Sequence, residues 1–437
     1  MQPAEIFVSI AAYRDPQLAA TLADCIGKAH FPDRLRFGIC RQRDPGDGAF
    51  AHAADARVRL LEVDWRESHG PCWARAQIMR MWRGEPWYLQ IDSHSRFAPG
   101  WDDSLITMLQ HCPGEKSILS SYPAPFAPGH EENLAGGPLR IAMVGFTRDG
   151  LPQLRPEWIT PPANGLPVPA RFLAAGFIFA PGSFVTDVPY DPELYFMGEE
   201  TTLTVRAYSQ GYDLYHPAKT VIWHDYTRTG AIRHWDDHRT DAPELIPWHE
   251  HDRRSRKKVL QILQGEPVTS CGLGQSRSLL QYEEYAGVSF RHRIIQNYTL
   301  RGDPPPNPRP APDWRKSTHR WIVKLEFSRQ QMHAQALQDP EHWAVSIRDH
   351  QSTLIHQEEF PAEQLLPLQQ AGDRLALVCE FYSETEPVNW LICPRSRSQG
   401  QLAQISGQFQ EDDVAQLAAD EPADAGISTT PEEQLAI

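Results

Sequence analysis

The sequence from residue 87 to residue 94 reads Trp87-Tyr88-Leu89-Gln90-Ile91-Asp92-Ser93-His94. Its first five residues form a short, mostly apolar run, which is typical of a strand buried in a parallel sheet. Asp92 and His94 follow two positions apart, and in extended backbone such residues point to the same side. A carboxylate and an imidazole suit a divalent ion such as Mn²⁺ better than Ca²⁺, which prefers oxygen ligands. The stretch therefore predicts a strand that ends in a metal site, with a solvated turn as the alternative interpretation.

Similar apolar runs alternate with helical patterns on the N-terminal side of this stretch. Residues 6–11, 35–40 and 58–63 have the pattern of buried strands, whereas residues 17–29 and 72–82 have the spacing of amphipathic helices. This alternation predicts an α/β fold built on a parallel sheet. Ligands of such sheets bind beyond the carboxyl ends of the strands, which is where Asp92 and His94 are expected.

The composition of the chain changes after about residue 300. A proline-rich stretch cannot form regular helix or a central strand, and the apolar runs beyond it favour a small β-rich domain. After Arg397 the chain has eight acidic residues and no Lys or Arg, which favours a disordered tail. We therefore predict four parts: an α/β domain over 1–300, a proline-rich linker over 301–313, a β-rich accessory domain over 314–409 and a disordered acidic tail over 410–437.

Charge and composition restrict the class of protein. The net charge of −14 over 437 residues argues against nucleic-acid binding, which needs a basic surface. The sequence has no apolar stretch long enough to span a membrane and no secretion signal at its start. Its seven scattered cysteines have no CxxC spacing, which favours reduced thiols over disulfides or a zinc site. We therefore expect a cytoplasmic globular protein.

Two later segments complete a pattern with the Asp92-Ser93-His94 triplet. Phe196-Met197-Gly198-Glu199-Glu200 precedes a predicted helix, and Val221-Ile222-Trp223-His224 predicts a strand that ends in a histidine. In this order the three elements resemble the polypeptide N-acetylgalactosaminyltransferases. That resemblance implies that Asp92, His94 and His224 bind Mn²⁺ and that Glu199 contributes to the sugar and acceptor site. A buried core histidine is the alternative interpretation of His224.

A second resemblance is closer and extends over about residues 5 to 295. The chain resembles the cytoplasmic N-acetylglucosaminyltransferases that modify hydroxyproline in a ubiquitin-ligase adaptor. This resemblance implies a GT-A-like glycosyltransferase fold, UDP-GlcNAc as donor, dependence on Mn²⁺ and retention of anomeric configuration. The motifs that carry it are Ile6–Pro16, Gly70–Arg75, Gln90–His94, Gly198–Glu200 and Arg277–Val288.

The same resemblance implies roles for residues at the expected donor site. Tyr13-Arg14-Asp15 follows the first strand, where the family binds uridine, and an ordinary β–α turn is the alternative. Arg75, near the start of a helix, is expected to contact the diphosphate or the sugar, with a solvated helix arginine as the alternative. Ser93 joins Asp92 in donor binding. Because transfer on a single face needs no general base, Glu199 is expected to position sugar and acceptor.

These expectations combine into one functional hypothesis with two rivals. The chain is expected to transfer N-acetylglucosamine from UDP-GlcNAc to a hydroxyl of a protein, namely of hydroxyproline, serine or threonine. One rival keeps the UDP-sugar chemistry but has a glycan or small molecule as acceptor. The other is a non-catalytic interaction protein on a glycosyltransferase scaffold. The C-terminal domain is expected to select the acceptor or to form an oligomer.

Overall fold

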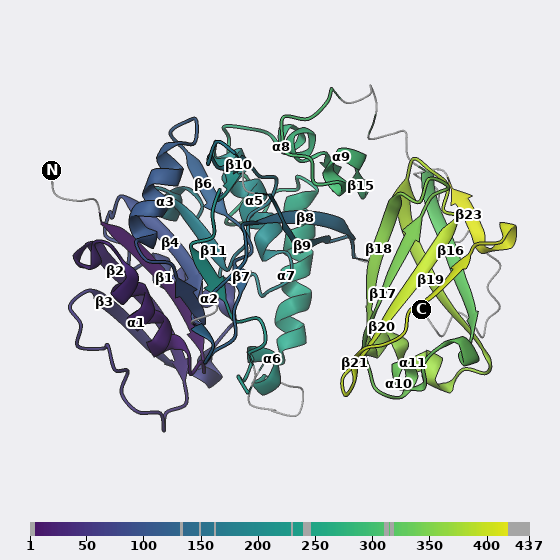
Figure 1. Ribbon diagram of the computed structural model, residues 1–437, viewed down its shortest axis with the longest axis horizontal. Coiled ribbons are helices and arrows are strands. Elements are labelled where there is room, and N and C mark those ends of the chain that lie inside the picture. The colour runs from purple at the N-terminus through teal and green to yellow at the C-terminus, as the bar shows by residue number, and fades with distance from the viewer. Residues whose placement is uncertain are drawn as a thin grey trace. The chain divides into compact units, whose positions relative to one another are not determined.

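A computed structural model describes residues 5–131, 134–147, 150–160, 163–228, 230–238, 246–309, 314 and 319–417. The chain divides into two compact units (Figure 1). The first contains residues 1–142, 155–286 and 304–306, and the second contains residues 143–154, 287–303 and 307–437. The predicted 301–313 segment therefore contributes residues to both units, and its residues 310–313 lie outside the described ones.

An eight-stranded sheet forms the centre of the first unit. Its strands in spatial order are β10 (Val168–Pro169), β12 (Asp213–His216), β6 (Ser117–Ser120), β11 (Phe177–Pro181), β4 (Trp87–Asp92), β1 (Ile6–Tyr13), β2 (Leu35–Arg43) and β3 (Val58–Asp64). Strands β4, β1, β2 and β3 are mutually parallel, as are β12 and β6. The predicted α/β class with a largely parallel sheet is therefore confirmed.

One central strand runs against its neighbours. β11 pairs antiparallel with both β4 and β6, whereas the sequence alone predicts a parallel sheet. Its first residue, Phe177, pairs with Ile91, the penultimate residue of β4. The beginning of β11 therefore lies beside the carboxyl end of β4, where Asp92 is found.

Helices cover both faces of this sheet (Figure 1). Alternate residues of β1, such as Val8, pack in one apolar core with residues of helices α1 (Leu18–Lys28) and α3 (Trp101–Gln110). On the opposite face a Cβ atom at Gly38 would lie 2.4 Å from the Phe7 ring and 2.7 Å from Ile78 of helix α2 (Pro71–Met79). A glycine in β2 thus allows α2 to lie close against the sheet.

The remaining elements of the first unit flank the sheet. A three-stranded sheet has the order β5 (Ser95–Phe97), β13 (Ile222–His224) and β7 (Ala124–Pro125). The other helices are α4 (Phe184–Asp187), α5 (Glu199–Ser209), α6 (His234–Asp237), α7 (Trp248–Leu263) and α8 (Leu279–Ala286). No helix among the described residues has both the length and the apolar character needed to cross a membrane.

The second unit is a β-sandwich. One sheet has the order β19 (Arg374–Ser383), β16 (His319–Ser328) and β23 (Val414–Leu417), and the other contains β18 (Leu354–Pro361), β17 (Pro340–Arg348), β20 (Asn389–Ser396), β21 (Gly400–Gln401) and β22 (Ile405–Gln408). Their inner faces share one apolar core that includes Val323, Trp343 and Leu377. The predicted β-rich C-terminal part is therefore confirmed.

Short elements complete the chain outside these sheets. They are the hairpin β8 (Leu139–Phe146) and β9 (Pro152–Trp158), the pair β14 (Val288–Ser289) and β15 (Ile294–Ile295), and helices α9 (Asn297–Leu300), α10 (Ala334–Gln338) and α11 (Ala362–Gln370).

The beginning of the predicted disordered tail has regular structure. β23 pairs antiparallel with β16, and a short 3₁₀ helix, Glu411–Asp413, precedes it. The prediction of disorder from residue 410 is therefore wrong for residues 410–417. Val414 packs on the apolar core, and this local contact outweighs the acidic composition. Residues 418–437 of the predicted tail lie outside the described residues.

Candidate metal and donor-sugar site

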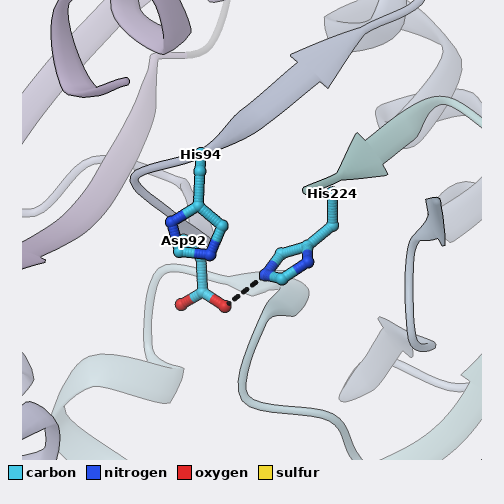
Figure 2. Close-up of side chains that lie close together, drawn as sticks. All are labelled: Asp92, His94 and His224. Carbon is cyan, nitrogen blue, oxygen red and sulfur yellow. Dashed lines mark hydrogen bonds and ion pairs between the residues drawn. The ribbon is translucent and has the colours of Figure 1, made fainter. Parts of the chain in front are cut away.

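Asp92, His94 and His224 converge at the carboxyl edge of the central sheet (Figure 2). Each offers one metal-binding atom, and these atoms all lie within 4.8 Å of one another. The imidazole Nε2 of His224 lies 3.0 Å from Oδ2 of Asp92, and the two histidine rings have centroids 4.4 Å apart. His94 and His224 are buried, whereas the Asp92 side chain is 24% exposed. The group is thus open to a ligand on the side of Asp92.

Strand pairing brings His224 to the other two residues. β5 begins directly after His94 and pairs antiparallel with β13, so that His224 lies opposite Ser95. The backbone N–H of Asp225 also donates to the carbonyl of His94 at 3.0 Å. These backbone bonds set the distance between two segments that are 130 residues apart in the sequence.

Asp15 orients His94 from the end of β1. Its Oδ2 atom lies 2.7 Å from Nδ1 of His94, and it also accepts from the hydroxyl of Ser93 at 2.7 Å and from Arg228 at 3.2 Å. Burial raises the pKa of Asp15, but the bonds and charges of His94, Ser93 and Arg228 outweigh it and lower this pKa to about 2. A carboxylate on Nδ1 leaves Nε2 of His94 as the nitrogen that could bind a metal.

Arg75 connects Asp92 to Glu199. Its guanidinium donates to Oδ1 of Asp92 at 2.7 Å and forms a second ion pair with Glu199. Arg75 and Glu199 are both buried, and Glu199 begins helix α5, where the helix dipole favours a carboxylate. One arginine therefore holds the metal-site carboxylate and the predicted sugar-site carboxylate in a single ion-paired group.

The protonation states of the group fit a cation site. Burial opposes ionisation of Asp92, yet the hydrogen bond from His224 and the charge of Arg75 lower its pKa below the ordinary value. Burial also lowers the pKa of His224, which keeps the imidazole neutral. A carboxylate with two imidazoles is a donor set that Mn²⁺ accepts. Nδ1 of His224 is a buried nitrogen without a hydrogen-bond partner among the described residues, and the hydrogen bond to Asp92 places the proton of the neutral imidazole on Nε2. A cation bound at Nε2 would take the place of this proton. These residues therefore fit a divalent cation.

Tyr13 and Arg14 lie at the same edge but contact a different carboxylate. The hydroxyl of Tyr13 donates to Asp237 at 2.9 Å, and Nη1 of Arg14 reaches both carboxylate oxygens of that residue at 2.8 and 2.9 Å. Arg14 has a positive φ of 46° and lies over the ring of Trp65. Helix α6 thus fixes the two predicted donor residues through Asp237.

The segment before β11 forms a wall beside Asp92. Glu200 accepts from the hydroxyl of Tyr122 at 2.6 Å and from the backbone N–H of Ala175 at 2.8 Å. Burial raises the pKa of Glu200 to about 7, against these hydrogen bonds, which lower it. A Cβ atom at Gly176 would lie 3.0 Å from Oδ2 of Asp92, so a glycine here leaves room for that carboxylate.

Sequence reasoning missed several of these contributions. The role of Asp15 as a partner of His94 was not predicted, because its position after the first strand indicated only the donor site. Arg228, Asp237 and Gly176 have no sequence signal, since each acts through a contact formed only in the folded chain. Glu200 was visible beside Glu199 at the start of the predicted helix, but its contacts with Tyr122 and Ala175 were not predicted.

Three solved structures are similar to part of the chain. The crystal structure of GalNAc-T7 with UDP, GalNAc and Mn²⁺ is 13% identical with a TM-score of 0.44, and the match covers 64% of this chain and 50% of that chain. The crystal structure of S. aureus TarS 1–349 is 12% identical with a TM-score of 0.35, covering 51% and 60%. Its complex with UDP-GlcNAc is 11% identical with a TM-score of 0.34, covering 60% and 73%. The chain thus spans about half the length of the GalNAc-T7 chain.

Comparison of the sequence with curated proteins and comparison with family models gave different results. No curated protein matches the chain. The family model described as Glycosyltransferase (GlcNAc) matches residues 5–53 and 49–292, which is more than half of the chain and contains every residue of the site described above. The chain therefore belongs to the Glycosyltransferase (GlcNAc) family.

Proposed function

We propose that the protein transfers N-acetylglucosamine from UDP-GlcNAc to a hydroxyl group of a protein, on hydroxyproline, serine or threonine. The observation that carries this proposal is the convergence of Asp92, His94 and His224 within 4.8 Å, joined through Arg75 to Glu199. Membership of the Glycosyltransferase (GlcNAc) family supports the reaction class. The proposed transfer retains the anomeric configuration.

Each residue has a role in this proposal. Asp92, His94 and His224 hold Mn²⁺ or another divalent cation, which when bound neutralises charge on the departing diphosphate. Asp92 and Ser93 line the donor site, and Tyr13 and Arg14 fix the uridine side of the same edge. Arg75 fixes the charge and orientation of both Asp92 and Glu199.

Glu199 aligns the sugar with the acceptor hydroxyl and is not a nucleophile. Arg75 pairs with one of its carboxylate oxygens, Oε1, which leaves lone pairs on the carboxylate for a sugar or acceptor hydroxyl. The acceptor oxygen forms its bond to the sugar on the face that the diphosphate leaves, and the leaving phosphate takes the acceptor's proton. The contribution of the protein is then positioning and charge stabilisation.

Hydrolysis of UDP-sugars tests the donor and the metal site together. We expect wild type to hydrolyse UDP-GlcNAc faster than UDP-GalNAc or UDP-glucose, and only with Mn²⁺. Asp92→Ala should lower this rate by about 100-fold or more, whereas Asp103→Ala, an exposed carboxylate on α3, should leave it unchanged. Metal-independent hydrolysis that Asp92→Ala leaves intact would overturn the proposed site. Absence of both turnover and UDP binding would favour the interaction-protein alternative.

A peptide panel tests the acceptor. Peptides that differ only in hydroxyproline, serine, threonine or alanine at one position are incubated with UDP-GlcNAc and Mn²⁺, and mass spectrometry measures the added sugar. Transfer to hydroxyl-bearing peptides, with the same anomer in donor and product by NMR, is the expected result. Transfer to a free glycan or small alcohol with no peptide product would support the other acceptor class instead.

A cytoplasmic location is part of the proposal. None of the seven cysteines, all of which lie among the described residues, forms a disulfide, and five of them are buried. Thiols in this number are typical of a reducing compartment. Fractionation of cells that make the protein tests this location, and recovery in a secreted fraction would contradict it.

A further inference from the structure

We propose that His356, Glu358 and Cys379 form a second metal site, selective for Zn²⁺, which joins the two sheets of the β-sandwich. One ligand atom from each of these three residues lies within 4.8 Å of the others. The cluster lies in the second unit, outside residues 5–292 that match the family model. It is therefore independent of the proposed transfer reaction.

Strand geometry directs all three side chains into the core of the sandwich. His356 and Glu358 are two residues apart on β18, so that they share one face, and they pair with Ile347 and Val345 of β17. Cys379 lies on β19 of the other sheet, with its side chain in the same apolar core. A metal bound here would have ligands from both sheets.

Burial makes this cluster unusual among its apolar neighbours. His356, Glu358 and Cys379 are 6%, 3% and 0% exposed. A carboxylate inside an apolar core is unfavourable unless an opposite charge or a metal compensates it. His356 lies 3.3 Å from Glu358, and its ring stacks on Phe381, with centroids 4.5 Å apart and planes within 11°. The stacking holds the imidazole next to the carboxylate.

The distances and ligand types favour zinc. Two ligand atoms bound to tetrahedral Zn²⁺ at about 2.0–2.1 Å lie about 3.3 Å apart, which matches the separation of His356 Nε2 and Glu358 Oε2. A thiolate with an imidazole selects Zn²⁺ over Mn²⁺ or Ca²⁺, whereas the Asp92 site has no sulfur ligand. His356 also lines a cavity of about 40 Å³, which is large enough for a water molecule beside this residue.

Cobalt is the probe that separates the two sites. Co²⁺ bound to a thiolate gives a sulfur-to-metal charge-transfer band in the near ultraviolet, and the Asp92, His94 and His224 site cannot produce it. The full-length, metal-stripped protein is titrated with Co²⁺ and then with Zn²⁺. We expect one equivalent of the thiolate band in wild type and in Asp92→Ala, and loss of that band when Zn²⁺ displaces Co²⁺.

Substitutions assign the band to the cluster. Cys379→Ser should abolish it, whereas Cys393→Ser, a partly buried thiol of the same sandwich, should keep it. Glu358→Gln has the same shape and should retain the band but weaken Co²⁺ binding at least tenfold. This second variant tests the proposal even if Cys379→Ser does not fold. In the Asp92→Ala background Zn²⁺ should raise the unfolding midpoint, and Glu358→Gln should reduce that shift. Absence of the band in folded wild type, or its persistence in Cys379→Ser, would overturn the proposal and leave His356 and Glu358 as a buried ion pair.

Discussion

Asp15 supports the proposed metal-binding residues without being one of them. It accepts from Nδ1 of His94, from Ser93 and from Arg228 through a single carboxylate oxygen. A carboxylate in this position fixes both the tautomer and the orientation of a ligating histidine. Affinity for the metal is therefore expected to depend on a residue that never contacts it.

Replacement of the Asp15 carboxylate should weaken metal binding with little effect on the stability of the fold. In Asp15→Asn the amide can keep a hydrogen bond to Ser93 but carries no charge for His94 or Arg228. We expect the Mn²⁺ concentration needed for half-maximal UDP-sugar hydrolysis to rise by about 10- to 100-fold. Asp103→Asn on the exposed face of α3 is the matched control. An unchanged Mn²⁺ dependence would show that Asp15 has no role at the site.

Glu200 should make stability depend on pH. Burial raises its pKa from the ordinary value of 4.5 to about 7 in the folded chain, so the folded state favours the protonated carboxyl. This contribution is fully present below pH 4.5 and is lost as the pH rises through 7. Relative to wild type, Glu200→Gln should therefore gain about 3 kcal/mol of unfolding free energy between pH 4.5 and pH 8.

Urea unfolding at several pH values measures this difference. Glu67→Gln, an exposed carboxyl, is the control and should show no pH-dependent difference from wild type. A constant difference between Glu200→Gln and wild type across the range would mean that Glu200 ionises normally in the fold.

Part of the site could be predicted from the sequence, because some of its residues lie close together along the chain. Asp92 and His94 are neighbours in the chain, so extended backbone alone places them together. His224 required the pairing of β5 with β13, which only the motif order indicated. The Asp15–His94 bond and the Arg75 bridge join side chains across 79 and 124 positions, and no periodicity determines such choices.

At the scale of elements, the α/β alternation was readable because buried strands are apolar runs bounded by turns. β1 to β4 appeared where the sequence predicted strands. The antiparallel direction of β11 could not be predicted, because a run of apolar residues does not indicate which way its strand runs in the sheet. The connection before β11 also contains short, proline-rich segments, which do not indicate the direction either. The strand β23 was not predicted, because a run of four residues, Val414–Leu417, is too short a sequence signal within an acidic segment.

The start of β11 offers a test of how elements shape the site. Gly176→Ala adds a methyl group 3.0 Å from Oδ2 of Asp92, so that the carboxylate, which also contacts His224, must shift by a few tenths of an ångström. We expect the rate of Mn²⁺-dependent hydrolysis to fall by about tenfold to 100-fold, with little change in the unfolding midpoint.

A second glycine provides the control for this substitution. A Cβ atom at Gly27 in helix α1 would meet nothing within 4 Å. Gly27→Ala should therefore leave hydrolysis unchanged and stabilise the helix by up to about 1 kcal/mol. Equal activity of Gly176→Ala and wild type would show that the Asp92 carboxylate tolerates the added methyl group.

At the scale of the whole molecule, the end of the described chain, strand β23, is part of a sheet of the second unit. β23 covers the edge of β16, which would otherwise present unpaired backbone groups. Truncation after Gln410 should lower the unfolding free energy of the second unit on the order of 2 kcal/mol and promote self-association. Truncation after Leu417 keeps β23 and should behave like the full chain. Thermal unfolding and size-exclusion chromatography measure both effects, and identical behaviour of the two truncations would contradict a structural role for β23.

The reversed strand β11 also bears on how relatives of this chain can diverge. In a fully parallel sheet, every connection that enters a strand lies at the edge away from the ligand. Because β11 runs backwards, the connection over residues 170–176 arrives at the ligand edge instead. Insertions and deletions there would change the wall beside Asp92 without changing the order of the strands. Relatives can thus differ in the backbone beside Asp92 while they keep the same arrangement of strands.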